Sequence, residues 1–352
     1  MKKIFLLVSI AIMLVLSCGN EGKNSSEAGG GKSKDSFKIG ITQIVAHPAL
    51  DSAREGFKDA FKEAGLKVVF DEKNANGEIA TANMIANNFI TEKVDMIYAI
   101  ATSTAQAAAQ STDKIPVVFS AITDPEAAGI LKKNVTGISD RVNVKQQLEL
   151  LLKLDSKIKK VGVIYNSSEQ NSKVQVDDLK KAASELRITI VEKSVTQVSE
   201  IPQASETLVK ESDALYLPTD NLVASVVNLI TEKAIKAKKI AFGAESAHVK
   251  GGALITQGID YYEMGKEAGK IAVDILKNGK NPSEITFKKM DLNDIVINNK
   301  TLAAIGISLP EDIKSVVMNV LRHRLVLSYE AAADNVTADE IISRIMNFIP
   351  VP

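Results

Sequence analysis

Residues 96–122 read MIYAIATSTAQAAAQSTDKIPVVFSAI, and this stretch decides the fold. Short apolar runs at 96–100 and 117–122 have the length and composition of buried strands, and an alanine-rich segment at 104–112 has helical period. Pro116 ends the helical segment because proline cannot continue a helix. Buried strands that alternate with helices in this way predict parallel strands joined by right-handed crossovers.

The same alternation continues on both sides of this stretch. The first half predicts strands at 37–45, 67–71, 96–100, 117–122 and 135–139, with helices at 49–64, 78–92 and 104–112. After residues 143–157 the rhythm restarts, with strands at 161–165, 188–194, 214–218, 240–243 and 253–257 and helices at 171–186, 199–210, 222–237 and 262–278. Two sets of five strands predict an α/β fold of two doubly wound parallel-sheet lobes. In such folds the ligand cleft lies beyond the carboxyl ends of the strands.

The composition is that of an ordinary globular protein. The chain has 352 residues, of which 45% are hydrophobic and 24% charged, and its formal net charge is zero. This length suits about two domains, and the neutral balance gives no electrostatic footprint for nucleic acid. His47, His248 and His323 are scattered and one cysteine is present, so we expect no metal and no cofactor. Because no nucleophile–base pair, dinucleotide fingerprint or phosphate-binding loop is visible, we do not expect an enzyme.

The first 18 residues have the form of a bacterial lipoprotein signal peptide. Lys2 and Lys3 precede an apolar run at 4–16, which is too short to span a bilayer, since spanning takes roughly 20 residues. Small and aliphatic residues before the single Cys18 resemble a lipobox, in which the thiol takes a diacylglycerol. An ordinary signal peptide with an incidental cysteine is the alternative. We expect lipidation at Cys18, which would anchor the protein outside the cytoplasm, in the periplasm or on the cell surface. Residues 19–36 would form a flexible tether between this lipid anchor and the folded body.

Polar residues follow three predicted strands of the first lobe. They are Gln43 and His47 around the end of the first strand, with Pro48 beside them, Thr102, Ser103 and Thr104 after the third, and Ser120 and Asp124 around the end of the fourth. Ordinary roles would explain each residue singly: a surface cap for His47, helix caps for the hydroxyls and a turn for Asp124. Hydroxyls at the carboxyl end of a strand, where a helix begins, also suit a carboxylate or phosphate ligand.

The second lobe repeats this arrangement. Its candidate binding residues are Tyr165, Asn166 and Asn171 after the first strand of the lobe, Asp220 and Asn221 after the third, and Glu245 after the fourth. A helix cap is again the ordinary alternative for each acidic residue. Acidic residues paired with Ser, Thr or Asn in several loops at the same edge of a sheet nevertheless indicate a binding site.

Four motifs carry a resemblance to one family. They are residues 41–43 with 47–51, residues 119–125, residues 165–166 with 171–172, and residues 218–221. The chain resembles the substrate-binding lipoproteins of ABC transporters that have the type 1 periplasmic-binding-protein fold. Within these it is similar to the subgroup linked to aromatic and hydrophobic amino acids such as tryptophan. The resemblance extends from Phe37 to about Val320.

The resemblance implies two lobes that close on a ligand and are joined by three crossovers near 140–143, 253–259 and 279–285. Lobe 1 would comprise residues 37–141 and 257–283, and lobe 2 would comprise 142–256 and 284–320. The implied function is capture of a hydrophobic or aromatic amino acid for an ABC permease. A ligand-sensing lipoprotein of the same fold, or one that binds a sugar or nucleoside, is the alternative. The absence of Trp and the 5% aromatic content speak weakly against a sugar, since sugar sites commonly stack on aromatic rings.

A free amino acid requires three kinds of contact. Its carboxylate needs backbone N–H groups and hydroxyls at helix starts, which residues 102–104 and 166–167 offer. Its ammonium needs a carboxylate, for which Asp124, Asp220 and Glu245 are candidates. Its side chain needs an apolar pocket, which we expect around Ile44, Pro48 and Tyr165.

The last 32 residues, 321–352, differ in character from the rest. They resemble the C-terminal lid segment of MoxR-type AAA+ ATPases, without any nucleotide-binding motif, so the resemblance implies no ATPase activity. A gene fusion or frameshift and a family-specific extension are the alternative explanations. Thr337 and Glu340 have the spacing of a capping box, which predicts a final helix at 338–348.

Overall fold

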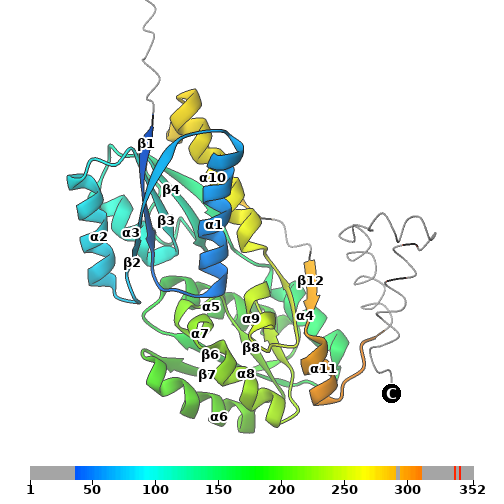
Figure 1. Ribbon diagram of the computed structural model, residues 1–352. Helices are drawn as coiled ribbons and strands as arrows, with labels where there is room; N and C mark the ends of the chain where they lie inside the picture. The colour runs from blue at the N-terminus through cyan, green and yellow to red at the C-terminus, as the bar shows by residue number, and fades with distance from the viewer. Residues whose placement is uncertain (1–35, 291–293, 311–336, 338–340, 342–352) are drawn as a thin grey trace, which may run out of the picture. The chain divides into compact units, whose positions relative to one another are not determined.

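The computed structural model describes residues 36–290, 294–310, 337 and 341. Within them the chain forms two sheets (Figure 1). The first sheet contains β1 (Phe37–Gln43), β2 (Val68–Asn74), β3 (Met96–Ile100), β4 (Val117–Ile122), β5 (Val135–Ser139) and β11 (Lys288–Lys289). Its order is β11-β5-β4-β3-β1-β2, and each pair of neighbours is parallel.

The second sheet has the equivalent strand order but differs in the direction of one edge strand. Its strands are β6 (Lys160–Asn166), β7 (Thr189–Val195), β8 (Ala214–Leu217), β9 (Ala241–Gly243), β10 (Ile255–Gly258) and β12 (Asp294–Ile297). They lie in the order β12-β10-β9-β8-β6-β7, and β12 pairs antiparallel with β10. The sequence prediction of two parallel-sheet units is therefore confirmed, with one antiparallel edge strand that the alternation did not reveal.

Helices cover both sheets. Those beside the first sheet are α1 (Pro48–Glu63), α2 (Ile79–Thr91), α3 (Thr102–Ser111) and α10 (Tyr261–Asn278). Those beside the second are α4 (Val144–Leu154), α5 (Gln170–Glu185), α6 (Ile201–Glu211), α7 (Asn221–Ser225), α8 (Val227–Lys236), α9 (Ser246–Lys250) and α11 (Asn299–Ile305). Short 3-10 turns are η1 (Val198–Glu200) and η2 (Pro282–Glu284). None of the helices in the described part of the chain combines the length and the apolarity that crossing a membrane requires.

Most predicted elements are present within a few residues of their expected ends. The helix predicted at 222–237 is broken at Val226, whose backbone (φ −135°, ψ 28°) leaves the helical range and separates α7 from α8. The helix predicted at 104–112 begins two residues earlier, at Thr102. The short elements α9, α11, β11 and β12 were not predicted, because none spans enough residues to show a period.

The chain passes between the sheets three times in the described part: after β5, after β10, and between β11 and β12. The third was expected near 279–285, and this is wrong. Lys288 and Lys289 still pair with Ile138 and Ser139 of β5, so the chain leaves the first sheet only after Lys289. The rest of the predicted division into two lobes stays a prediction.

Helices α1 and α10 pack closely against each other beside the first sheet (Figure 1). Their contact depends on glycine. A Cβ on Gly56 would lie 2.0 Å from the Tyr262 carbonyl oxygen, and a Cβ on Gly265 would lie 1.9 Å from the Ala53 carbonyl oxygen. Since side-chain carbon atoms are excluded at such distances, the two backbones approach one another directly.

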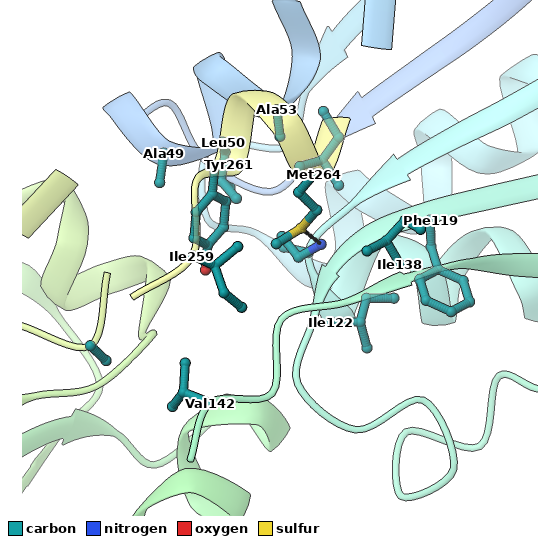
Figure 2. Packing of buried hydrophobic residues seen from close by; sticks show 14 of the residues in the cluster. Ala49, Leu50, Ala53, Phe119, Ile122, Ile138, Val142, Ile259, Tyr261 and Met264 are labelled. Carbon is teal, nitrogen blue, oxygen red and sulfur yellow. Dashed lines mark hydrogen bonds between the residues drawn. The ribbon is translucent and has the colours of Figure 1, made fainter. Parts of the chain in front are cut away.

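The core beneath the strand ends joins α10 to the first sheet. Figure 2 shows Met264 of α10 among Leu50, Ile122 and Tyr261, all of which are buried. The Met264 sulfur accepts a hydrogen bond from the Ala121 backbone N–H at 3.2 Å. This contact fixes the end of β4 onto the start of α10. The segment that follows the second crossover is thereby fixed to the first sheet.

Candidate ligand-binding site

Loops at the carboxyl ends of strands in both sheets line one small buried cavity, here called the polar cavity. Its first-sheet side is made by His47, Leu50, Ala121, Asp140 and Tyr261. Its second-sheet side is made by Asn171, Thr219, Asp220, Asn221, Ala224 and Glu245. The volume of about 10 Å³ corresponds to one water molecule. Five predicted site residues therefore line the same cavity: His47, Asn171, Asp220, Asn221 and Glu245.

Three carboxyl groups, those of Asp140, Asp220 and Glu245, line the polar cavity, and all are buried. None of the described Lys or Arg residues lines it. Burial raises the pKa of Asp220 to about 7 and that of Glu245 to about 8, and it also raises the pKa of Asp140. In each group, burial disfavours the ionised form more than the local hydrogen bonds favour it, and a cation in the cavity would stabilise that form.

Glu245 has one carboxyl oxygen without a donor, while the Tyr261 hydroxyl, which donates to Asp140, also hydrogen-bonds its carboxyl group and moderates its raised pKa. Its side chain is only 2% exposed, and its Oε1 atom has no hydrogen-bond partner. His248 Nε2 lies 3.3 Å from Oε1 without adequate hydrogen-bond geometry. Burial lowers the pKa of His248 to about 3, so this imidazole is neutral and supplies no positive charge. A buried acceptor without a donor is costly and commonly marks a functional site.

Asp140 is held by two hydroxyl groups. Tyr261 Oη donates to Oδ2 at 2.8 Å, and Thr123 Oγ1 donates to Oδ1 at 3.0 Å. Burial and the neighbouring carboxylates Asp140 and Glu245 raise the pKa of Tyr261, so its hydroxyl stays protonated. Sequence reasoning did not name Asp140 or Tyr261 among the candidate site residues, although both line the polar cavity. Asp140 directly follows a predicted strand, a signal that could have found it.

Both carboxylate oxygens of Asp220 accept hydrogen bonds from β6, α5 and α7 beside the second sheet. The Asn166 N–H donates to Asp220 at 2.5 Å, Ser172 Oγ at 2.6 Å and the Val223 N–H at 2.8 Å. The last bond caps α7. Asp220 therefore lies where the sequence predicted it, but its oxygens hold the loop after β8 together.

Glu169 is a further buried carboxylate that the sequence did not reveal. It accepts hydrogen bonds from the side chains of Asn166 (3.2 Å), Asn171 (3.1 Å) and Asn221 (2.5 Å) and from the backbone N–H of Leu222 (3.2 Å). The predicted residues Asn166, Asn171 and Asn221 are thus arranged around it. The Oδ1 atom of Asn171 has no partner and lies in a residue that lines the polar cavity.

His47 and Asn221 form a contact between segments of the two sheets, with His47 Nε2 3.4 Å from Asn221 Oδ1. Burial lowers the pKa of His47 to about 4, so the ring is neutral near pH 7. Its Nδ1 atom has no partner. A surface cap, the ordinary alternative for His47, is excluded because the side chain is buried and makes no cap hydrogen bond to α1.

A second, larger cavity of about 480 Å³, here called the apolar cavity, shares Asn221 with the polar cavity. It lies at the ends of β1, β2, β6 and β7, away from the crossovers. Its lining contains the predicted residues Ser103 and Asn166, and Ile44 of the predicted apolar pocket. Its apolar lining also includes Val45, Ile79, Val198 and Leu222.

The start of α3 lies at the border of the apolar cavity through Ser103. The Thr102 hydroxyl is buried without a partner, whereas the Thr104 hydroxyl donates to the carbonyls of Ile100 (2.7 Å) and Ala101 (2.9 Å). Ala101 precedes the helix with φ +84°, a region that favours glycine, and no side chain caps the helix. Free N–H groups and one free hydroxyl are therefore present here, while Thr104 has a structural role.

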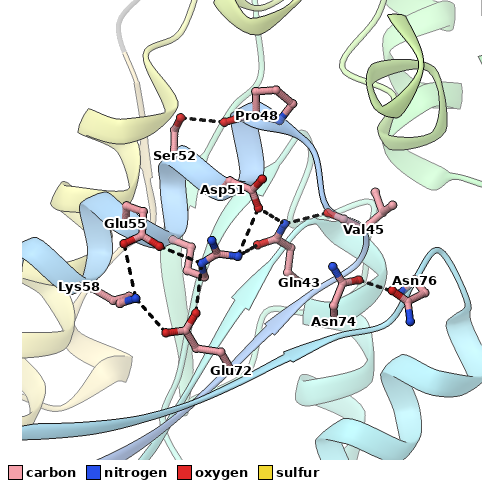
Figure 3. Close-up of polar contacts among 11 residues, drawn as sticks. Gln43, Val45, Pro48, Asp51, Ser52, Glu55, Lys58, Glu72, Asn74 and Asn76 are labelled. Carbon is pink, nitrogen blue, oxygen red and sulfur yellow. Dashed lines mark hydrogen bonds and ion pairs between the residues drawn. The ribbon is translucent and has the colours of Figure 1, made fainter.

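Besides Thr102 and Thr104, five predicted site residues line neither cavity. Gln43 contacts the Val45 carbonyl at 2.8 Å and Asp51 at 2.9 Å (Figure 3). Ser120 is buried and shares a 2.6 Å hydrogen bond with the Tyr98 hydroxyl. Pro48 is exposed at the start of α1, and Tyr165 is half-buried on β6. None of these four residues lines the polar or the apolar cavity.

Asp124, the fifth, forms an ion pair at 2.6 Å with Arg141, which also contacts Asp178 at 2.8 Å. Its other oxygen accepts the backbone N–H groups of Glu126 and Ala127. Both carboxylate oxygens are thus occupied, as in the ordinary turn interpretation.

Cys18 and nearly all of 321–352 lie outside the described residues. There the Ile341 N–H donates to the Thr337 carbonyl at 3.2 Å, and the remainder of the predicted helix at 338–348 is not described. In the described part no group of three or more His, Cys, Asp and Glu residues has an arrangement suited to a metal ion.

The C-terminal segment matches a different family from the body. A model described as the AAA lid domain matches residues 308–345. The chaperone MoxR1 of Mycobacterium tuberculosis (strain ATCC 25618 / H37Rv) is 41% identical over 44 residues, 12% of either chain. The predicted resemblance of the tail is confirmed, and it is confined to this segment.

The body of the chain matches transport proteins. A "Tyrosine-binding protein" of Clostridioides difficile (strain R20291) is 40% identical over 321 residues, 86% of this chain and 92% of that protein. The structure of the ABC domain in complex with L-Trp from Streptococcus pneumonia is 33% identical with TM-score 0.75, covering 79% of this chain and 98% of that one. The ligand-free, open structure of a substrate-binding protein with adhesive properties from Clostridium difficile is 44% identical with TM-score 0.61, covering 78% and 97%.

The family model described as "ABC transporter substrate binding protein" matches residues 38–321, nearly the whole folded body. Proteins of this family are binding components: they work outside the cytoplasm, hold small molecules and act with ABC permeases. The family predicted from the four sequence motifs is therefore confirmed. The chain belongs to the ABC transporter substrate-binding protein family.

Proposed function

We propose that this protein captures a free aromatic amino acid and delivers it to an ABC permease. The 40% identical relative is named for tyrosine and the 33% identical structure holds L-Trp, and both names support an aromatic amino acid as the ligand. The observation that carries the proposal is Glu245 Oε1, a buried carboxylate oxygen with no partner in a cavity whose described lining contains no Lys or Arg. An ammonium group supplies both the charge and the N–H donors that this oxygen lacks.

The ammonium of the ligand would lie against Glu245, beside Asp140 and Asn171. All three residues line the polar cavity, and Asn171 Oδ1 is a second acceptor without a partner. Asp220 would attract the ammonium by its negative charge from nearby, while its oxygens stay hydrogen-bonded to Asn166, Ser172 and Val223. Strict recognition follows, because a ligand without an ammonium would leave a buried carboxylate unpaired.

The carboxylate of the ligand would lie at the start of α3. The Thr102 hydroxyl has no partner there, and the first N–H groups of a helix are available to an anion. Ser103 extends this donor set to the border of the apolar cavity. This assignment keeps the predicted role of residues 102 and 103 and leaves Thr104 to its backbone contacts.

Binding would require the two lobes to separate and close again. The polar cavity of about 10 Å³ cannot hold an amino acid, so the His47–Asn221 contact has to open. The TM-scores favour such a motion. The chain is more identical to the open structure (44%) than to the L-Trp complex (33%), but superposes better on the complex, with 0.75 against 0.61.

We also propose that the mature protein is a lipoprotein held at the membrane through Cys18. The support is the signal-like sequence of residues 1–18 and the single cysteine at its end. Replacement by Cys18→Ser should release the protein from the membrane fraction of expressing cells. A variant that still sediments with membranes, although its signal sequence is processed, would contradict the anchor.

The ligand proposal is tested by calorimetric titration of the protein with L-tyrosine, L-tryptophan and L-phenylalanine. We expect Glu245→Gln to weaken binding by well over tenfold, since the loss of a buried charge partner costs about 2–5 kcal/mol. Asp124→Asn is the matched control, because Asp124 is also a loop carboxylate but lines neither cavity. Equal affinities for wild type and Glu245→Gln would remove Glu245 from the site.

A further inference from the structure

We propose that the apolar cavity is the compartment for the side chain of the ligand, and that Ile79 and Val198 determine the preference for aromatic rings. The inference rests on the proposed function, since it assumes that an amino acid is bound at the polar cavity. It adds a part of the cleft, formed after β2 and β7, in which the sequence indicated no binding residue. The sequence prediction placed the apolar pocket around Ile44, Pro48 and Tyr165, and only Ile44 lines this cavity.

Size separates the two cavities. The polar cavity has a volume of about 10 Å³, whereas the apolar cavity has about 480 Å³. Small-molecule sites typically have volumes of about 300–1,000 Å³. An indole or phenol ring therefore has space only in the second cavity, while the small ammonium head suits the first.

Two exposed apolar side chains lie in the wall of the larger cavity. Ile79 is 52% exposed and Val198 is 43% exposed, and both line this cavity. Ile79 begins α2 beside the first sheet, and Val198 begins η1 after β7 of the second sheet. Large apolar side chains left in water at a cavity that both sheets line indicate a surface that a ligand covers. Closure of the lobes on a ring would bury both.

The polar residues of this cavity restrict the ring further. Its described lining contains no Lys or Arg and includes the carboxylates Glu78 and Glu169, so an acidic side chain is disfavoured. Glu169 is already occupied by asparagine and backbone donors. Asn76 and Gln197 at the rim offer amide groups to a phenol hydroxyl or an indole N–H. An apolar ring with one polar edge matches this lining.

Asn221 connects the two compartments. It lines both cavities, its Nδ2 atom donates to Glu169 at 2.5 Å, and its Oδ1 atom lies 3.4 Å from His47 Nε2. An amino acid with its ammonium at Glu245 and its ring between Ile79 and Val198 would pass this residue at its α-carbon. The ammonium group would thus lie in the polar cavity and the aromatic ring in the apolar cavity.

The test is titration with L-tryptophan of wild type and of the Ile79→Ser/Val198→Ser double variant. We expect at least about tenfold weaker binding by the double variant, since each lost apolar contact in a pocket reduces affinity severalfold. Val69→Ser/Met84→Ser is the matched control. These side chains are 58% and 57% exposed, and they line neither cavity. This control should bind as wild type does.

Fluorescence gives a second readout that general destabilisation would not produce. The chain contains no Trp, so the emission of bound L-tryptophan reports only on the ligand. We expect a blue shift on binding to wild type and a smaller shift at saturation of the double variant. Unchanged affinity and blue shift in the double variant, with binding lost in Glu245→Gln, would overturn the side-chain compartment and leave the proposed function intact. A wild type that binds no amino acid would overturn both.

Discussion

The loops after β8 and β9 each place a carboxylate at the polar cavity, and the two carboxylates differ in their partners. Burial raises the pKa of both, to about 7 for Asp220 and about 8 for Glu245. Asp220 accepts three hydrogen bonds from β6, α5 and α7, whereas Glu245 Oε1 accepts none. The first carboxylate holds its loop together, and the second is the one that we propose binds the ligand. A raised pKa therefore does not distinguish a structural carboxylate from a ligand-binding one, but the list of donors does.

The largest expected effect on stability is that of Asp220→Ala. The change leaves the donors of Asn166, Ser172 and Val223 without an acceptor and removes the cap of α7. We expect a loss of about 2–4 kcal/mol in the free energy of unfolding, measured in denaturant. At pH 5, where folded Glu245 holds its proton, Glu245→Gln should change it by less than about 1 kcal/mol, because Oε1 accepts no hydrogen bond. Equal losses in the two variants would abolish the distinction.

A smaller loss is expected from Tyr216→Phe, which acts beneath the same loop. Tyr216 Oη donates to Gln147 at 2.6 Å and accepts from Gln175 at 3.2 Å. Gln175 in turn accepts the Thr219 N–H at 2.6 Å, next to Asp220. We expect destabilisation by about 1–2 kcal/mol, seen as a lower melting temperature. The variant should also weaken amino-acid binding several fold, because Thr219 lines the polar cavity; unchanged binding would mean that the network only supports the fold.

The pH dependence of binding sharpens the comparison further. An ammonium favours the ionised form of Glu245 and lowers its pKa from about 8, so binding below pH 8 releases a proton. Affinity should therefore rise from pH 6 to pH 8, by at most about tenfold per pH unit. Calorimetry in buffers of different ionisation enthalpy would count the released proton. Glu245→Gln should lose this release, while a release that persists in it would assign the titration to Asp220 or Asp140.

Without ligand, the same group acts on stability with the opposite sign. Between the ordinary value of 4.5 and about 8, folded Glu245 keeps a proton that the unfolded chain releases, so the free energy of unfolding falls as pH rises. Glu245→Gln removes this contribution. Its stability relative to wild type should increase between pH 5 and pH 8, as measured by urea unfolding at several pH values. A constant difference would contradict the raised pKa.

The smallest effect is expected for Asp124→Asn. Asp124 has a full ion pair with Arg141, but both side chains are partly exposed, 20% and 33%. Such pairs contribute about 0–1 kcal/mol, so the variant should unfold within about 1 kcal/mol of wild type. Unfolding in high salt provides the check, since screening should reduce even this difference.

The sequence predicted the two sheets well because buried strands and amphipathic helices alternate throughout the body. It could not predict β11, where two exposed lysines pair with β5, since only the tertiary arrangement creates that pairing. For the site it predicted Asp220 and Glu245 at one cavity. It did not reveal that Gln43 contacts Asp51 on α1, because which neighbour a side chain meets depends on packing. Asp140 was overlooked because its position after β5 was interpreted only as a crossover.

The backbone contact between α1 and α10 has a consequence for how this protein can diverge. Gly56 and Gly265 admit no larger side chain, and the two helices they join begin beside His47 and at Tyr261. Mutations that would shift one of these helices relative to the other are excluded by steric overlap. The first-sheet wall of the polar cavity is therefore a poor place for new ligand preferences to arise. Loops such as those after β2 and β7, which no glycine contact of this kind constrains, are where related proteins can change their cargo without refolding.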